Sequence, residues 1–364
     1  MLLKKQGHDL KKISNIFFVI IWLISGEVFH TFSQKYAGKT TEIDSFCDPK
    51  VRNMVPSKGL VLSYERIYKY NVSSFSENTA IGDGNANIDY NRLFLLKIKV
   101  PYANKPWLKG ALGFKFSKEK FYFLDKENLQ YPLYKSLDSK PLRVIGGAVY
   151  LTKPFKGDNY FIMKLSANLS GDYENVQSGR AKYLKGSLIP LYGWKKNKDL
   201  SYGFGMAYSY TFGNPSIYPI IAFYRNFSPV FGVEAVLPQS LRFRYNINNK
   251  SILSALIKAH GNSYNIQLDD TVFSSMKRLE LRKAELRFGI DYEREIYDFL
   301  WFGVNSGYRM NLVSDLAKIN KETDAISGIF AKRNYLIETN IGGAFFINVA
   351  LYIVPPKRFL KLED

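Results

Sequence analysis

Residues 200–212 read LSYGFGMAYSYTF, and this stretch decides the fold. Every second residue from Tyr202 to Phe212 is large, and the residues between them are Ser, Gly, Ala or Thr. In a strand, successive side chains point to opposite faces, so one face of this segment is a wall of aromatic and aliphatic side chains. A helix would spread the same residues around its whole circumference. The stretch therefore predicts a β-strand with one bulky apolar face.

The same alternation recurs through the rest of the chain. In residues 284–293, Leu286, Phe288 and Ile290 alternate with charged residues, and residues 241–247, 302–312 and 345–353 follow the same rule. Several runs reach about ten residues, the length that a tilted membrane strand needs. Strands of soluble proteins are typically about five or six residues long. The pattern favours a closed antiparallel transmembrane β-barrel, and a soluble secreted β-sandwich is the architectural alternative.

The number of strands follows from the lengths of the connections. Candidate strands lie near 59–68, 92–100, 110–123, 141–152, 159–170, 185–194, 200–212, 216–226, 230–237, 239–248, 251–267, 279–293, 298–312 and 334–353. Long connections are expected at 69–91, 124–140, 171–184, 268–278 and 313–333. If the chain turns at Pro238–Gln239, long and short connections fall on opposite sides, as in outer-membrane barrels with an even strand number. We predict fourteen strands, or twelve if 185–194 or 230–237 is not an independent strand.

The first residues have the features of an export signal. Four lysines between Lys4 and Lys12 precede the apolar run IFFVIIWLI at residues 16–24, which is typical of a secretory signal peptide. Cleavage is expected after Ser33, with Gly26 as the alternative. The predicted organisation is a signal peptide (1–33), an N-terminal periplasmic segment (34–58), an outer-membrane barrel (59–354) and a C-terminal tail (355–364). The predicted location is the outer membrane of a Gram-negative cell.

Charged residues occupy the alternate positions that would face the interior of such a barrel. The lumen-facing candidates are Lys97, Lys99, Lys115, Lys164, Glu234, Arg242, Arg244, Lys258, Glu285, Arg287, Asp291 and Arg309, with Glu65 as a further acid. An excess of positive charge would lower the barrier for anions. We therefore predict a passive pore or small-solute transporter with a basic lumen. The alternative is a surface-exposed structural or partner-binding barrel whose interior is filled and does not conduct.

The formal net charge of +19 can indicate binding to nucleic acid or to anionic lipid, or can serve solubility alone. The Lys and Arg residues are scattered, and the sequence lacks the motifs of nucleic-acid-binding domains, so nucleic acid is not a predicted partner. Phosphate groups of outer-membrane lipid, including lipopolysaccharide, are the expected partners near the membrane rim. The barrel-assembly machinery is an expected partner during insertion, and a small anionic solute is a candidate for the lumen.

Few residues in the sequence could carry catalysis or bind a metal. Cys47 is the only cysteine, and His260 is the one histidine left after removal of the signal peptide. His260 and Ser263 are three residues apart, so a strand would place them on opposite faces. Residues 83–89, DGNANID, resemble the start of a calcium loop but lack its later Gly and Glu, so we interpret them as a solvated polar loop. We predict no catalytic residue, no metal, no cofactor and no enzymatic activity.

Three segments carry a resemblance to a known family. They are SYGFGMAYSYTFGNPSIYPIIAFYRNFSP (201–229), VEAVLPQSLRFRYNINNKSILSALI (233–257) and LRFGIDYEREIYDFLWFGVNSGY (286–308). Residues 142–354 resemble a Bacteroidota family of outer-membrane β-barrels known only as a domain of unknown function. The resemblance implies a fold and a compartment, and it implies no activity and no catalytic residues. The chain departs from many outer-membrane proteins because a tail follows Pro355 instead of an aromatic C-terminus.

Overall fold

The computed structural model describes Cys47 and residues 49–173, 183–273, 276, 279–318 and 335–355. The predicted signal peptide lies outside the described residues, as do most of the predicted periplasmic segment before Pro49 and the tail after Pro355. All described residues belong to one unit, Ser45–Pro355. Among them, no helix combines the length and the apolar composition that crossing a membrane requires.

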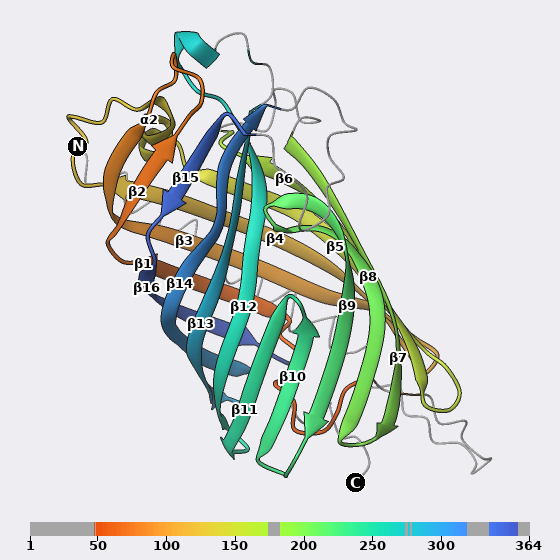
Figure 1. Cartoon of the computed structure of the whole chain (residues 1–364). Coiled ribbons are helices and arrows are strands. Elements are labelled where there is room, and N and C mark those ends of the chain that lie inside the picture. Colours follow the sequence, from red (N-terminus) through yellow and green to blue (C-terminus); the bar gives the residue numbers. More distant parts are fainter. Residues whose placement is uncertain are drawn as a thin grey trace, which may run out of the picture. The chain divides into compact units, whose positions relative to one another are not determined.

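The described residues form sixteen strand segments in one sheet (Figure 1). The strands are β1 (Leu60–Ile67), β2 (Tyr70–Phe75), β3 (Gly84–Lys105), β4 (Leu108–Phe123), β5 (Leu142–Pro154), β6 (Asn159–Gly171), β7 (Leu184–Asn197), β8 (Leu200–Phe212), β9 (Asn214–Asn226), β10 (Phe231–Leu237), β11 (Ser240–Asn248), β12 (Ser251–Ile266), β13 (Leu279–Tyr297), β14 (Leu300–Lys318), β15 (Ile337–Ile341) and β16 (Ala344–Ile353). The short helices are α2 (Pro132–Ser139) and the 3-10 helix η2 (Thr271–Phe273).

The sheet closes on itself because the first and last strands pair. β1 pairs antiparallel with β16, with Leu62 opposite Leu351, and its other edge pairs with β3. β2 continues β1 and pairs with β15, which continues into β16. Counted in this way, the segments make fourteen barrel strands, so the predicted closed antiparallel barrel and its strand number are confirmed.

The two ends of the barrel differ in their connections. At one end the turns are short: residues 106–107, 155–158, 198–199, 227–230, 249–250 and 298–299. The other end has the longer connections, including residues 124–141 with α2 and residues 267–278 with η2, together with two tight turns at 213 and 238–239 (Figure 1). We call these the short-turn end and the long-loop end. Outer-membrane barrels keep the short turns on the periplasmic side.

The outer face of the barrel carries the bulky side chains of the alternating pattern. Phe204, Met206, Ile290 and Phe345 are among the large apolar residues that remain exposed. Exposed apolar area on this scale is rare on soluble proteins and marks a surface that meets lipid or another apolar partner. The outer face therefore has the apolar surface that contact with lipid requires.

The prediction of a long loop at residues 69–91 was wrong. β2 begins at Tyr70, and β3 already begins at Gly84, so only residues 76–83 connect them. The polar sequence of this stretch hides the strands, because just one residue in two, such as Val72 and Ile88, turns inward and is buried. The predicted polar loop at 83–89 is thus mostly strand. Its side chains at 85, 87 and 89 project from an extended chain and do not converge.

The prediction of a loop from Val313 onward was also wrong. β14 extends to Lys318, and Leu316 is fully buried. The strand continues because its pairing with β13 resumes after a β-bulge between Ala284 and Glu285. This bulge interrupts the regular pairing while both strands continue toward the long-loop end.

The upper half of the barrel, toward the long-loop end, closes into a smaller ring. β12 pairs with β11 only up to Lys258 and then reaches β6, where Asn265 and Gly171 pair in parallel. Three hydrogen bonds support this junction: Asp172 N to Asn265 O (3.2 Å), Ser170 Oγ to Ser263 O (2.8 Å) and Asn262 Nδ2 to Ser170 Oγ (3.1 Å). The strands between β6 and β12 do not belong to this inner ring.

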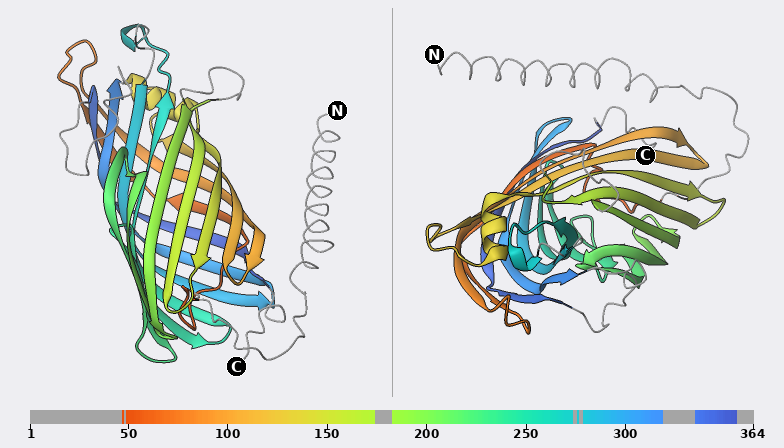
Figure 2. Two further views of the ribbon diagram at one scale, coloured as in Figure 1. Left: turned by 90° about the vertical axis from the view of Figure 1, so that its right-hand side faces the viewer. Right: turned by 90° about the horizontal axis from the view of Figure 1, so that it is seen from above.

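An apolar cluster fills the inner ring, and it includes Leu133 and Tyr134 of α2. Figure 2 shows the short yellow helix α2 at the long-loop end of the barrel. We call this cluster the apolar plug; its buried members include Ile67, Val72, Ile88, Phe121, Phe123, Leu133, Tyr134, Leu142, Leu281, Leu316, Ile337 and Phe346. Pro132 starts α2, a position where a missing N–H costs nothing. The Tyr134 hydroxyl donates to Ser74 Oγ and Gly84 O at 2.8 and 3.0 Å, and burial raises its pKa to about 12.

Candidate functional site

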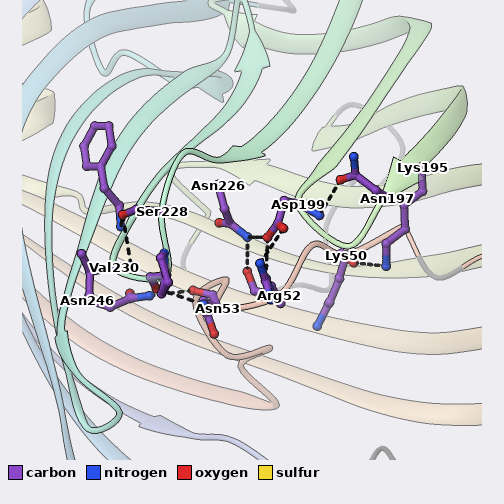
Figure 3. A network of polar contacts seen from close by, with 12 residues as sticks. Lys50, Arg52, Asn53, Lys195, Asn197, Asp199, Asn226, Ser228, Val230 and Asn246 are labelled. Carbon is purple, nitrogen blue, oxygen red and sulfur yellow. Dashed lines mark hydrogen bonds and ion pairs between the residues drawn. The ribbon is translucent and has the colours of Figure 1, made fainter. Parts of the chain in front are cut away.

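A segment before the first strand lies in the short-turn end of the barrel. We call residues 49–59 the N-terminal strap (Figure 3). Arg52 donates two hydrogen bonds to Asp199 in the β7–β8 turn, at 2.5 and 2.6 Å. The hydrogen bond from Arg52 lowers the pKa of the Asp199 carboxyl. The carbonyl oxygen of Lys50 accepts a hydrogen bond from Lys195 at 2.5 Å. The strap is therefore attached to the β7–β8 hairpin.

Arg244 fastens the middle of the strap to the inner wall. This side chain is 1% exposed, and its guanidinium donates to Asn53 O, to Asn226 Oδ1 at 2.6 Å and to Glu234 at 3.0 Å. Further along, Lys58 pairs with Glu293 at 2.6 Å. The strap thus contacts β7, the β7–β8 turn, β9, β11 and β13 before it enters β1.

One wall of the interior carries charges that neutralise one another. Glu285 contacts Arg287, Arg309 and His260, the last two at 3.4 Å. The remaining contacts of this paired-charge wall are Arg287–Glu65 at 2.7 Å, Arg242–Asp291 at 3.1 Å, Arg244–Glu234 at 3.0 Å and Lys283–Glu119 at 2.7 Å. The predicted candidates Glu234, Arg242, Arg244, Glu285, Arg287, Asp291 and Arg309 therefore lie in ion pairs on β10 to β14.

The opposite wall borders a cavity of about 390 Å³, which we call the basic cavity. Six lysines line it: Lys58, Lys97, Lys99, Lys115, Lys164 and Lys185. The described lining residues include no carboxylate. Lys58 and Lys185 pair with Glu293 and Glu280. The other four come from β3, β4 and β6, and none of them forms an ion pair with a carboxylate of the described residues. Lys258, also a predicted candidate, lies on β12 beside this group without lining the cavity.

The four unpaired lysines line the same cavity from three strands. Lys97 and Lys115 are direct cross-strand partners on β3 and β4. The charges of Lys97 and Lys164 repel the Lys115 ammonium. Lys99 lies 4.4 Å from the centre of the Tyr150 ring and Lys164 lies 5.9 Å from it. Gly113 makes room for this ring, because a Cβ there would be 2.8 Å from Tyr150 Cε2.

The sequence did not indicate a buried polar cluster between the inner ring and β7. Lys185 on β7 reaches Glu280 on β13, which also accepts a hydrogen bond from Ser263. Glu280 lies on the outer face of its strand, where lipid was expected, and it is only 4% exposed. The charged residue on the outer face of a predicted membrane strand was the feature of the sequence that could have indicated this cluster. Ser263 and His260 contact different carboxylates, Glu280 and Glu285.

The family described as Domain of unknown function (DUF6268) matches residues 145–353. Among solved structures, the toluene transporter TodX from Pseudomonas putida shares 10% identity, with 84% of this chain and 92% of that chain covered and a TM-score of 0.33. A FadL homologue from Pseudomonas aeruginosa shares 8%, covering 82% and 90%, with a TM-score of 0.37. The translocator domain of the autotransporter NalP from Neisseria meningitidis shares 10%, covering 81% and 88%, with a TM-score of 0.30. No curated protein matches the sequence. The predicted Bacteroidota origin stays a prediction.

Proposed function

For a chain that belongs to the DUF6268 family and forms a closed barrel with a lipid-facing surface, we propose transport of small anionic solutes across the outer membrane. The observation that carries the proposal is the basic cavity, which holds four unpaired lysines and no carboxylate among its described lining residues. A region of one sign of charge with low-dielectric walls raises the local concentration of the opposite ion. The proposed role of the basic cavity is a binding station for the solute.

The filled half of the barrel argues for a transporter that opens rather than for a permanently open pore. Barrels of about sixteen strands leave an aqueous channel, and small barrels are filled by their own side chains. Here the apolar plug occupies the long-loop half and the basic cavity lies below it. Passage would therefore require the plug, α2 included, to move. The alternative of a non-conducting, partner-binding barrel would be supported if no movement of this kind occurs.

We extend the proposal to the partners of the barrel and to its chemistry. Basic residues near both rims would contact the phosphate groups of outer-membrane lipid, including lipopolysaccharide. The barrel-assembly machinery would insert the chain, as expected for a closed barrel. We propose no enzymatic role, because His260 and Ser263 lie on opposite faces of β12 and engage separate acids.

Removing three lysine charges from the cavity is expected to abolish most anion flux. In Lys97→Gln/Lys115→Gln/Lys164→Gln, uptake of chloride and phosphate into proteoliposomes should fall by about tenfold or more. A cleft lined by charges of one sign raises the entry rate of the opposite ion by at least about that factor. The charge-matched control is Lys105→Gln/Lys118→Gln/Lys135→Gln, whose lysines are exposed away from the cavity. Equal anion flux in the triple variant and in the control would refute the proposed function.

A further inference from the structure

We propose that the solute is a phosphorylated, polyhydroxylated molecule of about one sugar ring, bound with its phosphoryl group between Lys97, Lys115 and Lys164. This inference rests on the proposed function and names the substrate class of the same site. It is built from three features of the basic cavity: the charge it leaves uncompensated, the chemistry of its cations, and the polar groups on its remaining surface.

The uncompensated positive charge of the cavity favours a solute with more than one negative charge. Like charges directly opposite on neighbouring strands are destabilising, and Lys97 faces Lys115 in this way. Lys164, on β6, lines the same cavity and adds a third cation to it. The acids of the paired-charge wall already have arginine, histidine or lysine partners. A bound dianion would relieve this repulsion better than a single carboxylate would.

The type of cation distinguishes a phosphoryl group from a carboxylate. The planar guanidinium of arginine matches a carboxylate with two parallel hydrogen bonds, whereas lysine binds phosphate as a point charge with three donors. In this barrel, Arg242, Arg244, Arg287 and Arg309 are all engaged by protein carboxylates. The cavity retains lysines alone as its cations. Three point charges from different strands suit a tetrahedral group with several oxygens.

The rest of the lining suits a solute rich in hydroxyl groups. Ser166, Asn168, Ser187, Ser209, Thr211 and Asn262 supply hydroxyl and amide groups. Such groups donate and accept hydrogen bonds and fix the orientation of a polar ligand. The volume of about 390 Å³ lies within the range of small-molecule sites, which is about 300–1,000 Å³. Ser166 bonds to Ser187 and Ser209 bonds to Thr211, and these hydroxyls keep further donor or acceptor capacity for a solute. A bare phosphate ion would not reach most of these groups.

Isothermal titration of the detergent-solubilised full chain tests the substrate class. The probes are glucose 6-phosphate, inorganic phosphate, gluconate, glucose and dihexanoyl phosphatidic acid. We expect glucose 6-phosphate to bind at least about tenfold more tightly than each of the others. Each of the other probes lacks either the phosphoryl group or the hydroxyl groups, and the loss of one charge-assisted hydrogen bond, or of two neutral ones, weakens binding by about that factor. Equal binding of gluconate would overturn the phosphoryl assignment. Equal binding of phosphate or of the lipid would overturn the hydroxyl assignment.

Single variants locate the binding site and separate this inference from the proposed function. Lys115→Gln should weaken glucose 6-phosphate binding by about tenfold, whereas Lys118→Gln, exposed three residues further along β4, should leave it unchanged. Lys164→Gln gives a second reading on a different strand. If these variants bind as the wild type does, the assigned site is wrong. If anion flux depends on the lysines but glucose 6-phosphate is not preferred, only this inference is wrong. If anion flux does not depend on the lysines, the proposed function is wrong.

Discussion

Conductance across a planar bilayer is expected to rise several-fold when the apolar plug is loosened by Leu133→Ser/Tyr134→Ser. Both side chains are 1% exposed and attach α2 to the interior of the inner ring. Replacing such residues by small ones costs about 2–5 kcal/mol of packing free energy each. A helix this short is not stable by itself, so other contacts of α2 cannot offset that loss. α2 should therefore leave the ring. The backbone ladder of the barrel does not depend on it.

Lys135→Ser is the matched control for the plug variant, because Lys135 is exposed on the same helix. Its conductance should equal that of the wild type. The current through the plug variant should also be anion-selective, since the opened path leads past the lysines of the basic cavity. A folded plug variant that stays silent, or a wild type that already conducts equally well, would contradict the role given to the plug.

Removal of the Glu285 carboxylate is expected to cause the largest loss of stability. Glu285 is the ion-pair partner of Arg309, which is 1% exposed, and it also contacts Arg287 and His260. Deleting one partner of a buried ion pair leaves an uncompensated charge and costs about 3–5 kcal/mol. Equilibrium unfolding of Glu285→Ala in urea, with the barrel in lipid vesicles, should show a decrease of that size in the free energy of unfolding.

Two variants check the physical reason for this loss. Glu338→Ala removes an exposed carboxylate from β15 and should change the free energy of unfolding by less than about 0.5 kcal/mol. Glu285→Leu/Arg309→Leu removes both charges and should be more stable than Glu285→Ala, because no unpaired ion remains between these two positions. A double variant less stable than Glu285→Ala would show that the loss does not come from the stranded Arg309 charge.

The period of two in the sequence identified the strands and their lipid face, because bulk on alternate positions is what a membrane requires of a strand. Residues 200–212 were predicted with the bounds that β8 has in the structure. The same period cannot show which inward side chains meet. Lys115 and Phe121 both point inward on β4, yet one lines the basic cavity and the other belongs to the apolar plug. The change from lysine to phenylalanine along the inward face of β4 was the feature of the sequence that could have indicated an apolar interior in the long-loop half of the barrel.

The inner ring was beyond sequence reasoning for a different reason. It depends on the junction at which β12 leaves β11 and reaches β6, around Asn265 and Gly171. Gly171 permits this approach, because a Cβ there would lie 2.3 Å from the Asn265 carbonyl oxygen. The sequence around these two residues has no pattern that predicts their pairing. Pairings between distant strands follow from how the whole sheet closes, which local alternation does not encode.

The position of a bound tetrahedral dianion inside the barrel tests the account most directly. Tungstate resembles phosphate in shape and charge, and its anomalous scattering locates it in crystals of the full chain. We expect one strong peak within hydrogen-bond reach of the Nζ atoms of Lys97, Lys115 and Lys164, absent from crystals of the triple glutamine variant. Tungstate found only at the outer rims, with the basic cavity empty of it, would contradict the claim that these lysines form an anion site.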